Sequence, residues 1–276
     1  AAGFEAVYLH WQNLDRWRAH FQPAFIAALR NAGIVVYGSA AVYGDNPAAE
    51  GHQAGAIVNA FNLAGFVFDA ESGFDAKATA AQNAVDLLKA YQGLTARPCA
   101  WCWWPLYRSS DGSTTYHPVA VLKAAMTIAD YGMPMAYWSW GNTAADAVRY
   151  LDEVWKQWRS VTAKPLIVAG RAYSGDGGIP TYEAVKAFDA RAHSLAAHAV
   201  TWWDMQHAVV LPDCWRALSE LSGSGEGKVI MANAIGLYTE SETWSNPDFD
   251  FIAGFAGKSW LDTPANLKAI DEKAAA

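Results

Sequence analysis

Short apolar runs alternate along the chain with longer segments in which apolar residues recur at helical spacing. The runs at residues 7–10 and 34–40 are rich in β-branched and aromatic side chains, which is typical of buried strands. A helical pattern at residues 23–31 lies between them and has a proline at its first turn, where proline is well tolerated. Repeated strand–helix units of this kind predict a parallel sheet.

The same pattern predicts further strands up to residue 204. We expect them at residues 65–70, 98–104, 133–139, 165–169 and 198–204. With the first two runs these make seven strands, one fewer than the eight that a closed α/β barrel requires. A short helix is expected at residues 212–221.

An eighth unit is expected at the far end of the chain. Residues 251–257 have strand character, and Thr263-Pro264 opens a helical pattern. Joining the last residue to the first would give an unbroken helix–turn–strand, whereas residues 222–228 have the Gly/Ser composition of a linker. Adjacent termini make circular permutation tolerable.

The sequence therefore predicts a single-domain (β/α)8 TIM barrel in circularly permuted order, spanning residues 1–276. Residues 1–221 would hold strands two to eight, 222–230 would be linker-like, and 231–276 would be the original N-terminal segment with strand one. The alternative is an irregular α/β fold with a C-terminal helical appendage.

Two acids stand at the end of the strand expected at residues 65–70. Asp69 and Glu71 are two residues apart, so their side chains emerge on the same face of an extended chain. Paired acids at the carboxyl end of a buried strand are how barrel enzymes present acid–base chemistry. The structural alternative is that one acid caps a helix and the other forms an ion pair. Asp75 is the residue we expect to cap a helix over residues 76–94.

Other side chains near the carboxyl ends of the expected strands could meet these acids. The further catalytic candidates are Tyr137 and Asp204, the latter because it ends an apolar strand without an obvious capping role. The substrate-binding candidates are Trp103, Trp138, Trp140, Trp202, Gln206, Arg171, His10 and Tyr43. Acids for proton transfer and flat rings for stacking suit a sugar site. Structural roles for His10, for about half of the tryptophans and for an ion-paired Arg171 remain alternatives.

Composition narrows the classes of partner. The chain has 14 Trp and 12 Tyr residues, and its formal net charge of -7 argues against a nucleic-acid partner. Cys99 and Cys102 form a C-x-x-C, but on a strand they point to opposite faces, so we expect core thiols and no metal or cofactor. No signal peptide opens the chain and no apolar run reaches about 18 residues, so we expect a soluble protein without membrane insertion.

The segment Gly-Phe-Val-Phe-Asp-Ala-Glu-Ser at residues 65–72 resembles the strand-four D-x-E of barrel glycosidases that include N-acetylmuramidases and chitinase-type enzymes. Met135-Ala-Tyr137 resembles the M-x-Y of the chitinase type, and residues 23–39 are similar to a helix and third strand of the muramidases. The likeness spans most of the barrel once the permutation is undone.

The resemblance implies that Glu71 is the general acid that protonates the leaving oxygen. Asp69 would assist an oxazolinium intermediate formed by a substrate N-acetyl group, and Tyr137 would help to hold it. The implied substrate is an N-acetylated polysaccharide of the peptidoglycan or chitin type. The sequence does not assign a compartment, and an extracellular or virion-associated location is the one considered. Phe66 and Phe68 stand where the chitinase pattern has aspartates. A non-catalytic glycan-binding or structural barrel of a phage or cell surface is therefore the alternative.

Overall fold

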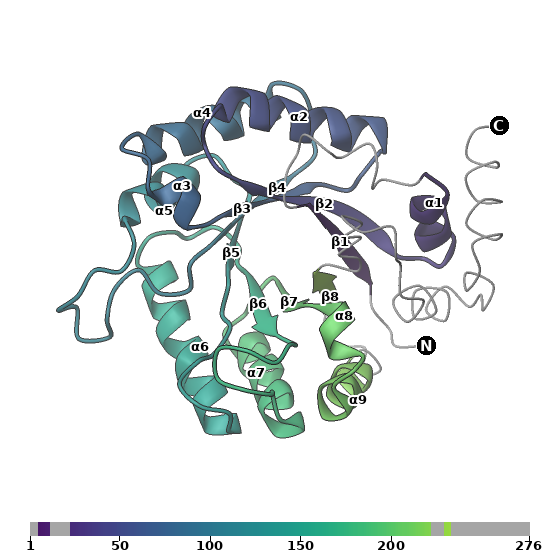
Figure 1. The fold of residues 1–276 in the computed structure, drawn as a ribbon, viewed down its shortest axis with the longest axis vertical. Helices are drawn as coiled ribbons and strands as arrows, with labels where there is room; N and C mark the ends of the chain where they lie inside the picture. The colour runs from purple at the N-terminus through teal and green to yellow at the C-terminus, as the bar shows by residue number, and fades with distance from the viewer. Residues whose placement is uncertain (1–4, 12–22, 222–228, 233–276) are drawn as a thin grey trace.

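The computed structural model describes residues 5–11, 23–221 and 229–232, without the side chains of residues 11, 206 and 229–232 (Figure 1). The strands are β1 (Ala6–Trp11), β2 (Val35–Val42), β3 (Phe66–Ala70), β4 (Cys99–Trp103), β5 (Tyr131–Pro134), β6 (Ile167–Arg171), β7 (Ala199–Trp203) and β8 (Val229–Ala232). The helices are α1 (Pro23–Asn31), α2 (Pro47–Ala60), α3 (Ser72–Asp75), α4 (Ala80–Gln92), α5 (Val119–Ala125), α6 (Ala144–Arg159), α7 (Tyr182–Ser194), α8 (Met205–Ala208) and α9 (Pro212–Leu221).

The strands form one parallel sheet in the order β5-β4-β3-β2-β1-β8-β7-β6. Parallel bridges Gly132↔Leu166 and Met135↔Ala169 link the β5 side to the β6 side. The Gly132 amide also donates a hydrogen bond of 3.0 Å to the Pro165 carbonyl. Figure 1 shows the strands around the centre of the molecule and the helices outside them. The predicted α/β fold with a parallel sheet is confirmed.

The strand between β1 and β7 differs from the one predicted. Val229–Ala232 occupies this position, pairing with β1 through Ala6↔Ile230 and with β7 through Val200↔Val229. Residues 229 and 230, expected in a linker, are therefore in a strand, and residues 251–257 lie outside the described residues. Eight strands arise here in simple chain order, so the strand count gives no support to a permutation, which stays a prediction.

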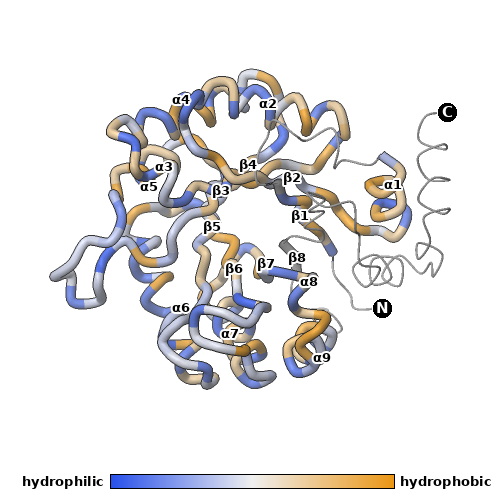
Figure 2. Tube along the Cα trace, in the orientation of Figure 1, coloured by the Kyte–Doolittle hydropathy of each residue, from blue (hydrophilic) through white to orange (hydrophobic). Residues whose placement is uncertain are grey.

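Strand alternation divides the buried side chains into two layers. An outer core packs the sheet against the helices and includes Phe66 and Phe68, whose rings lie 6.4 and 5.3 Å from that of Tyr91 on α4. An inner cluster on the other face joins side chains from six strands and from Met135 just beyond β5: Ala6, Tyr8, Val67, Ala100, Cys102, Met133, Met135, Ile167, Ala169 and Ala199. In Figure 2 the strands are coloured mainly toward the hydrophobic end, as burial on both faces requires.

The two cysteines of the C-x-x-C confirm this alternation. Cys99 belongs to the outer core and Cys102 to the inner cluster, and both are free thiols. The prediction of core thiols on opposite faces is therefore correct.

Three local boundaries differ from the expected ones. The strand predicted over residues 133–139 is Tyr131–Pro134, so residues 135–139 form an irregular segment beyond it. The helix expected over 76–94 is the shorter α4, which begins at Ala80, and a separate short helix, α3, ends before it at Asp75. Asp75 ends α3 instead of capping a helix, because its carboxylate accepts hydrogen bonds from two indoles.

Candidate functional site

A cavity of about 460 Å³ lies at the carboxyl ends of the strands. We call it the acid cavity, because both acids of the D-x-E line it. Its lining residues are Asp69, Glu71, Trp104, Pro105, Met135, Tyr137, Ser139, Tyr150, Tyr173, Asp176 and Trp203. The expectation that Asp69 and Glu71 face one common space is thus met by the geometry.

Asp69 is the more buried of the two acids. It points inward from β3, in register with Cys102 on β4, and its side chain is 13% exposed. Burial and the nearby charge of Glu71 raise its pKa to about 7, against a smaller opposing effect of the Cys102 thiol. A carboxyl with such a pKa can hold or release a proton near neutrality.

His10 is the basic side chain beside Asp69. Its Nε2 lies 4.0 Å from Asp69 Oδ2, and its Nδ1 lies 3.1 Å from Ser39 Oγ. Burial lowers the pKa of His10 to about 4, so the imidazole is neutral at pH 7. The ion-pair alternative for Asp69 therefore finds no charged partner in His10.

Glu71 stands at the exposed rim of the acid cavity. It occupies the N-cap position of α3, yet its side chain makes no capping hydrogen bond. Partial burial raises the pKa of its carboxyl. The helix-cap alternative therefore does not account for this carboxyl, which is available to a ligand in the cavity.

Aromatic side chains form the walls around these acids. Tyr137 reaches the cavity from the segment beyond β5, and its ring meets that of Tyr173 edge-on at 5.7 Å. Burial, together with the charges of Asp69 and Glu71 among other groups, raises the pKa of Tyr137, so its hydroxyl keeps its proton. Trp104 and Trp203 supply the two indole walls.

A second cavity of about 280 Å³ adjoins the first. Its lining residues are Trp104, Pro105, Leu106, Ser109, Ser110, Tyr116, His117, Ser139, Trp140 and Tyr150. Four of these, namely Trp104, Pro105, Ser139 and Tyr150, also line the acid cavity. Trp140 is 38% exposed here and meets the Tyr150 ring edge-on at 4.9 Å. It is thus near the acid cavity without lining it.

Three predicted substrate-binding tryptophans are instead buried in the outer core. Trp103, Trp138 and Trp202 are each fully buried, and the Trp138 and Trp202 rings pack around Phe188 of α7. For Trp103 and Trp202 the prediction chose the wrong face of the strand, because successive side chains point to opposite faces. The next residue in each case, Trp104 or Trp203, faces the acid cavity.

Asp204 and Arg171 also have structural partners instead of lining the acid cavity. Asp204 is 1% exposed and caps α8, accepting hydrogen bonds from the backbone and imidazole nitrogens of His207. Arg171 is fully buried at the end of β6 and donates to the Gly175 and Gly178 carbonyls and to Asn142 Oδ1. Arg171 therefore holds the loop after β6 in place.

Of the remaining candidates, Tyr43 is 45% exposed on the loop after β2 and does not line either cavity. The Gln206 side chain lies outside the described residues. His10 is close to Asp69 and therefore belongs to its surroundings, although it does not line the cavity wall.

Sequence reasoning missed several residues of the acid cavity. Tyr173 and Asp176 lie on the loop after β6, where the Tyr173 hydroxyl donates a hydrogen bond to the Asp176 carboxylate. Tyr150 comes from α6 and Ser139 from the segment after β5. Trp104 and Trp203 could have been found from strand parity, whereas loop contacts of this kind leave no periodic signal.

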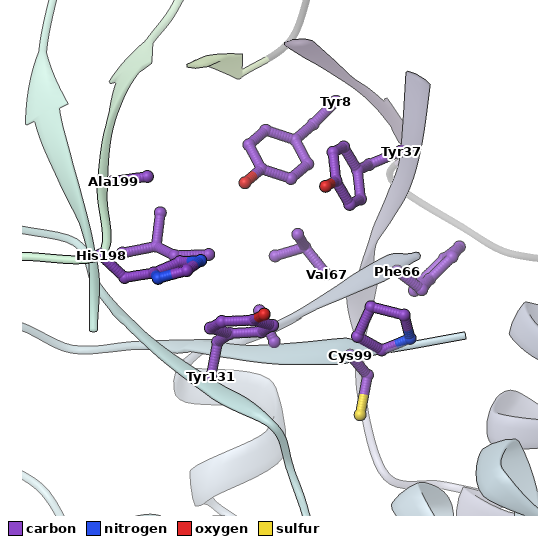
Figure 3. Close-up of a pocket in the computed structure, with 11 residues that line it drawn as sticks. Tyr8, Tyr37, Phe66, Val67, Cys99, Tyr131, His198 and Ala199 are labelled. Atoms are coloured by element: carbon purple, nitrogen blue, oxygen red, sulfur yellow. The ribbon is translucent and has the colours of Figure 1, made fainter. Parts of the chain in front are cut away.

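A third, smaller cavity of about 80 Å³ lies at the amino ends of the strands (Figure 3). Tyr8 and Tyr37 pack with ring centres 5.3 Å apart, and Tyr131 packs on His198 at 4.8 Å. In parallel α/β sheets, closed or open, ligands bind at the carboxyl ends of the strands. We therefore place the candidate site at the acid cavity.

Within residues 5–11, 23–221 and 229–232, no group of three or more His, Cys, Asp or Glu side chains is arranged to hold a metal ion. Over the same described part of the chain, none of the helices combines the length and the apolar character needed to cross a membrane.

Comparison with known proteins finds the fold but no close relative. No family model matches the chain, and no curated protein sequence matches it. Among solved structures, the Bacillus megaterium spore cortex-lytic enzyme SleL has a TM-score of 0.56 at 11% identity, covering 82% of this chain and 74% of that one. A class V chitinase from Pseudomonas fluorescens has a TM-score of 0.53 at 11% identity, covering 80% and 99%. A GH18 chitinase from Pseudoalteromonas aurantia has a TM-score of 0.50 at 13% identity, covering 70% and 79%. The chain therefore has the α/β fold of these glycoside hydrolase structures.

Proposed function

We propose that this protein is a glycoside hydrolase that cleaves an N-acetylated polysaccharide of the peptidoglycan or chitin type. The observation that carries the proposal is the acid cavity, in which two carboxyls of raised pKa meet a tyrosine hydroxyl and two indole walls. Perturbed carboxyls in a cleft are candidates for acid–base catalysis. The fold shared with a spore cortex-lytic enzyme and with chitinases supports the same class of reaction.

In the proposed reaction Glu71 transfers its proton to the glycosidic oxygen as the bond to the anomeric carbon breaks. The carbonyl oxygen of the substrate N-acetyl group forms the new bond to that carbon, as in substrate-assisted glycosidases. Asp69, beside Glu71 on the same face, accepts the N-acetyl N–H and stabilises the positive charge that develops. The Glu71 carboxylate then takes a proton from the water that opens the intermediate, which restores the starting state.

We further propose that the eight strands close into a barrel and that β8 is the first strand of an ancestral order. The bridges between the β5 and β6 sides support closure. If β8 is counted as strand one, the order β8-β1-β2-β3 makes β3, which carries the acids at its end, strand four. Strand four is the position of D-x-E in the glycosidases that the sequence resembles.

The experiment that tests the proposal compares the wild-type protein with Glu71→Gln. Turnover would be measured on purified peptidoglycan and on N-acetylglucosamine oligomers, and binding would be measured by calorimetry. We expect Glu71→Gln to lower kcat by about a hundredfold or more, because the amide cannot donate the proton, while the dissociation constant changes little.

The matched control is Glu183→Gln, the same change on the exposed first turn of α7. We expect full turnover in this variant. Undiminished turnover in Glu71→Gln would refute the assigned acid. A wild-type protein that binds these glycans without cleaving them would instead support the non-catalytic glycan-binding alternative.

A further inference from the structure

Asp75 connects the acid-bearing segment to an aromatic wall. Its Oδ1 accepts a hydrogen bond of 3.0 Å from the Trp103 indole, and its Oδ2 accepts one of 3.0 Å from the Trp104 indole. The Asp75 side chain is only 8% exposed. Both carboxylate oxygens are thus engaged by neighbouring indoles of the β4 end, only one of which faces the cavities.

Trp104 is the indole that matters for a ligand, because it lines both the acid cavity and the adjoining cavity. His117 stacks on it with ring centres 4.2 Å apart and planes 13° apart. The Nδ1 atom of His117 also lies 3.4 Å from Asp75 Oδ2. Asp75 therefore fixes the edge of the Trp104 ring, and His117 covers one of its faces.

The short helix α3 links the position of Glu71 to that of Trp104, because Asp75 at its end accepts the hydrogen bond from the Trp104 indole. Glu71 and Asp75 are at opposite ends of one turn, and the Asp75 amide donates a hydrogen bond of 3.0 Å to the Glu71 carbonyl. A shift of Asp75 would therefore change where Trp104 stands relative to Glu71. Sites of this kind need their supporting shell held to within about 0.5 Å.

We propose that Asp75 is a positioning residue that fixes Trp104 as the shared wall of the two cavities, and thereby sets the affinity for a glycan that spans both. The proposal rests on the proposed function, since it takes the ligand to be a glycan. It names the substrate more closely, as a chain of at least two sugar units lying across Trp104.

The informative substitution is Asp75→Asn. An indole N–H is a donor only, so two indoles need two acceptors, and the amide offers one acceptor and one donor. Since each indole faces a different carboxylate oxygen, the amide nitrogen would replace the acceptor of one of them. A hydrogen bond to a charged group is stronger than one to a neutral group, so its loss at Trp104 leaves the ring free to move, and we expect about a tenfold loss of affinity for a ligand that packs on it.

Two measurements test the proposal. The first is the dissociation constant, measured for N-acetylglucosamine and for its tetramer. We expect the value for the tetramer to rise about tenfold in Asp75→Asn. The second is the indole N–H resonances in a nitrogen-15 spectrum, where the signals of Trp103 and Trp104 are expected to move. Asp86→Asn on the surface of α4 is the matched control and should leave both measurements unchanged.

Single-ring substitutions separate positioning from general stability. Trp103→Phe removes the hydrogen bond of the buried indole, and it should lower the melting temperature with little effect on tetramer affinity. Trp104→Phe should weaken tetramer binding, and Asp75→Asn added to it should cause little further loss.

The outcomes are distinguishable from failure of the proposed function. If wild-type protein binds neither sugar, the proposed function fails, whereas the resonance shifts still report whether Asp75 holds Trp104. If the resonances move but tetramer affinity stays at the wild-type value, Asp75 does not position the ligand wall and the inference is overturned. Equal loss from Trp103→Phe and Trp104→Phe would also overturn it, because the effect would then be general destabilisation.

Discussion

At the scale of single residues, Asp69 shows how burial raises the pKa of a carboxyl toward neutrality. Its position on β3 is dictated by strand alternation, which places Phe66 and Phe68 against the helices and Asp69 toward the inside. The carboxylate loses water there without gaining a cationic partner, since burial keeps His10 neutral at pH 7. This desolvation raises the free energy of the ionised Asp69 carboxylate at the site where we propose the chemistry.

The raised pKa of Asp69 predicts that the stability of the fold depends on pH. The pKa of Asp69 is about 7 when folded and about 3.9 in an unfolded chain, so the folded state binds more protons between these values. Stability should therefore fall as pH rises from about 4 to about 7. In Asp69→Asn we expect this contribution to vanish, which urea unfolding at pH 4.5 and pH 7.5 would measure.

The quantity compared between variants is the difference in free energy of unfolding between pH 4.5 and pH 7.5, so that the contributions of other titrating groups cancel. Glu183→Gln serves again as the control and should keep the wild-type difference between the two pH values. The same difference in Asp69→Asn as in the wild type would show that Asp69 does not titrate in this window.

At the scale of elements, neighbouring tryptophans on one strand have different duties. Trp202 of β7 is fully buried against Phe188 and Trp138, whereas Trp203 lines the acid cavity. Successive side chains of a strand point to opposite faces, so the outward ring serves packing and the inward ring is open to a ligand.

We expect the two rings to respond differently to removal. Trp202→Ala should lower the free energy of unfolding by about 3–5 kcal/mol, because it empties a fully buried site. Trp203→Ala should cost less stability and weaken glycan binding more. Chemical denaturation and calorimetric titration would measure both, and a larger loss of stability in Trp203→Ala would contradict the assignment of faces.

The strand pattern explains what could be predicted from the sequence. Apolar runs and prolines at helix starts located β1 to β4, β6, β7, α1 and α9 closely, and D-x-E on a strand end indicated that Asp69 and Glu71 lie together. Parity was misjudged for Trp103 and Trp202, because a run apolar on both faces carries no inward–outward signal. The sequence suggested that Arg171 binds the substrate, but its guanidinium donates hydrogen bonds to backbone carbonyls of its own loop. Residue types along the sequence do not reveal such backbone partners.

At the scale of the whole molecule, β8 connects the first described strand to the later strands of the sheet. It pairs with β1 on one side and with β7 on the other. Without it, two strand edges would face solvent, and such edges promote association with other chains.

A truncated chain would test this role. We expect a chain ending at residue 221 to associate or aggregate, because the facing edges of β1 and β7 lose their partner. Light scattering after size-exclusion chromatography would measure this, with a chain ending at residue 232 as the control. A monomeric chain of 221 residues that melts at the temperature of the control would contradict the role of β8.

The pairing of β1 with β8 also governs when the protein can finish folding. Residues 229–232 follow β1 by about 220 residues, so β1 lacks its partner on that side until they have been synthesised. Contacts so distant in sequence form late and slowly. The edge of β1 that pairs with β8 therefore stays unpaired while the intervening residues are synthesised, and chaperones that shield exposed strand edges would have their greatest effect during that interval.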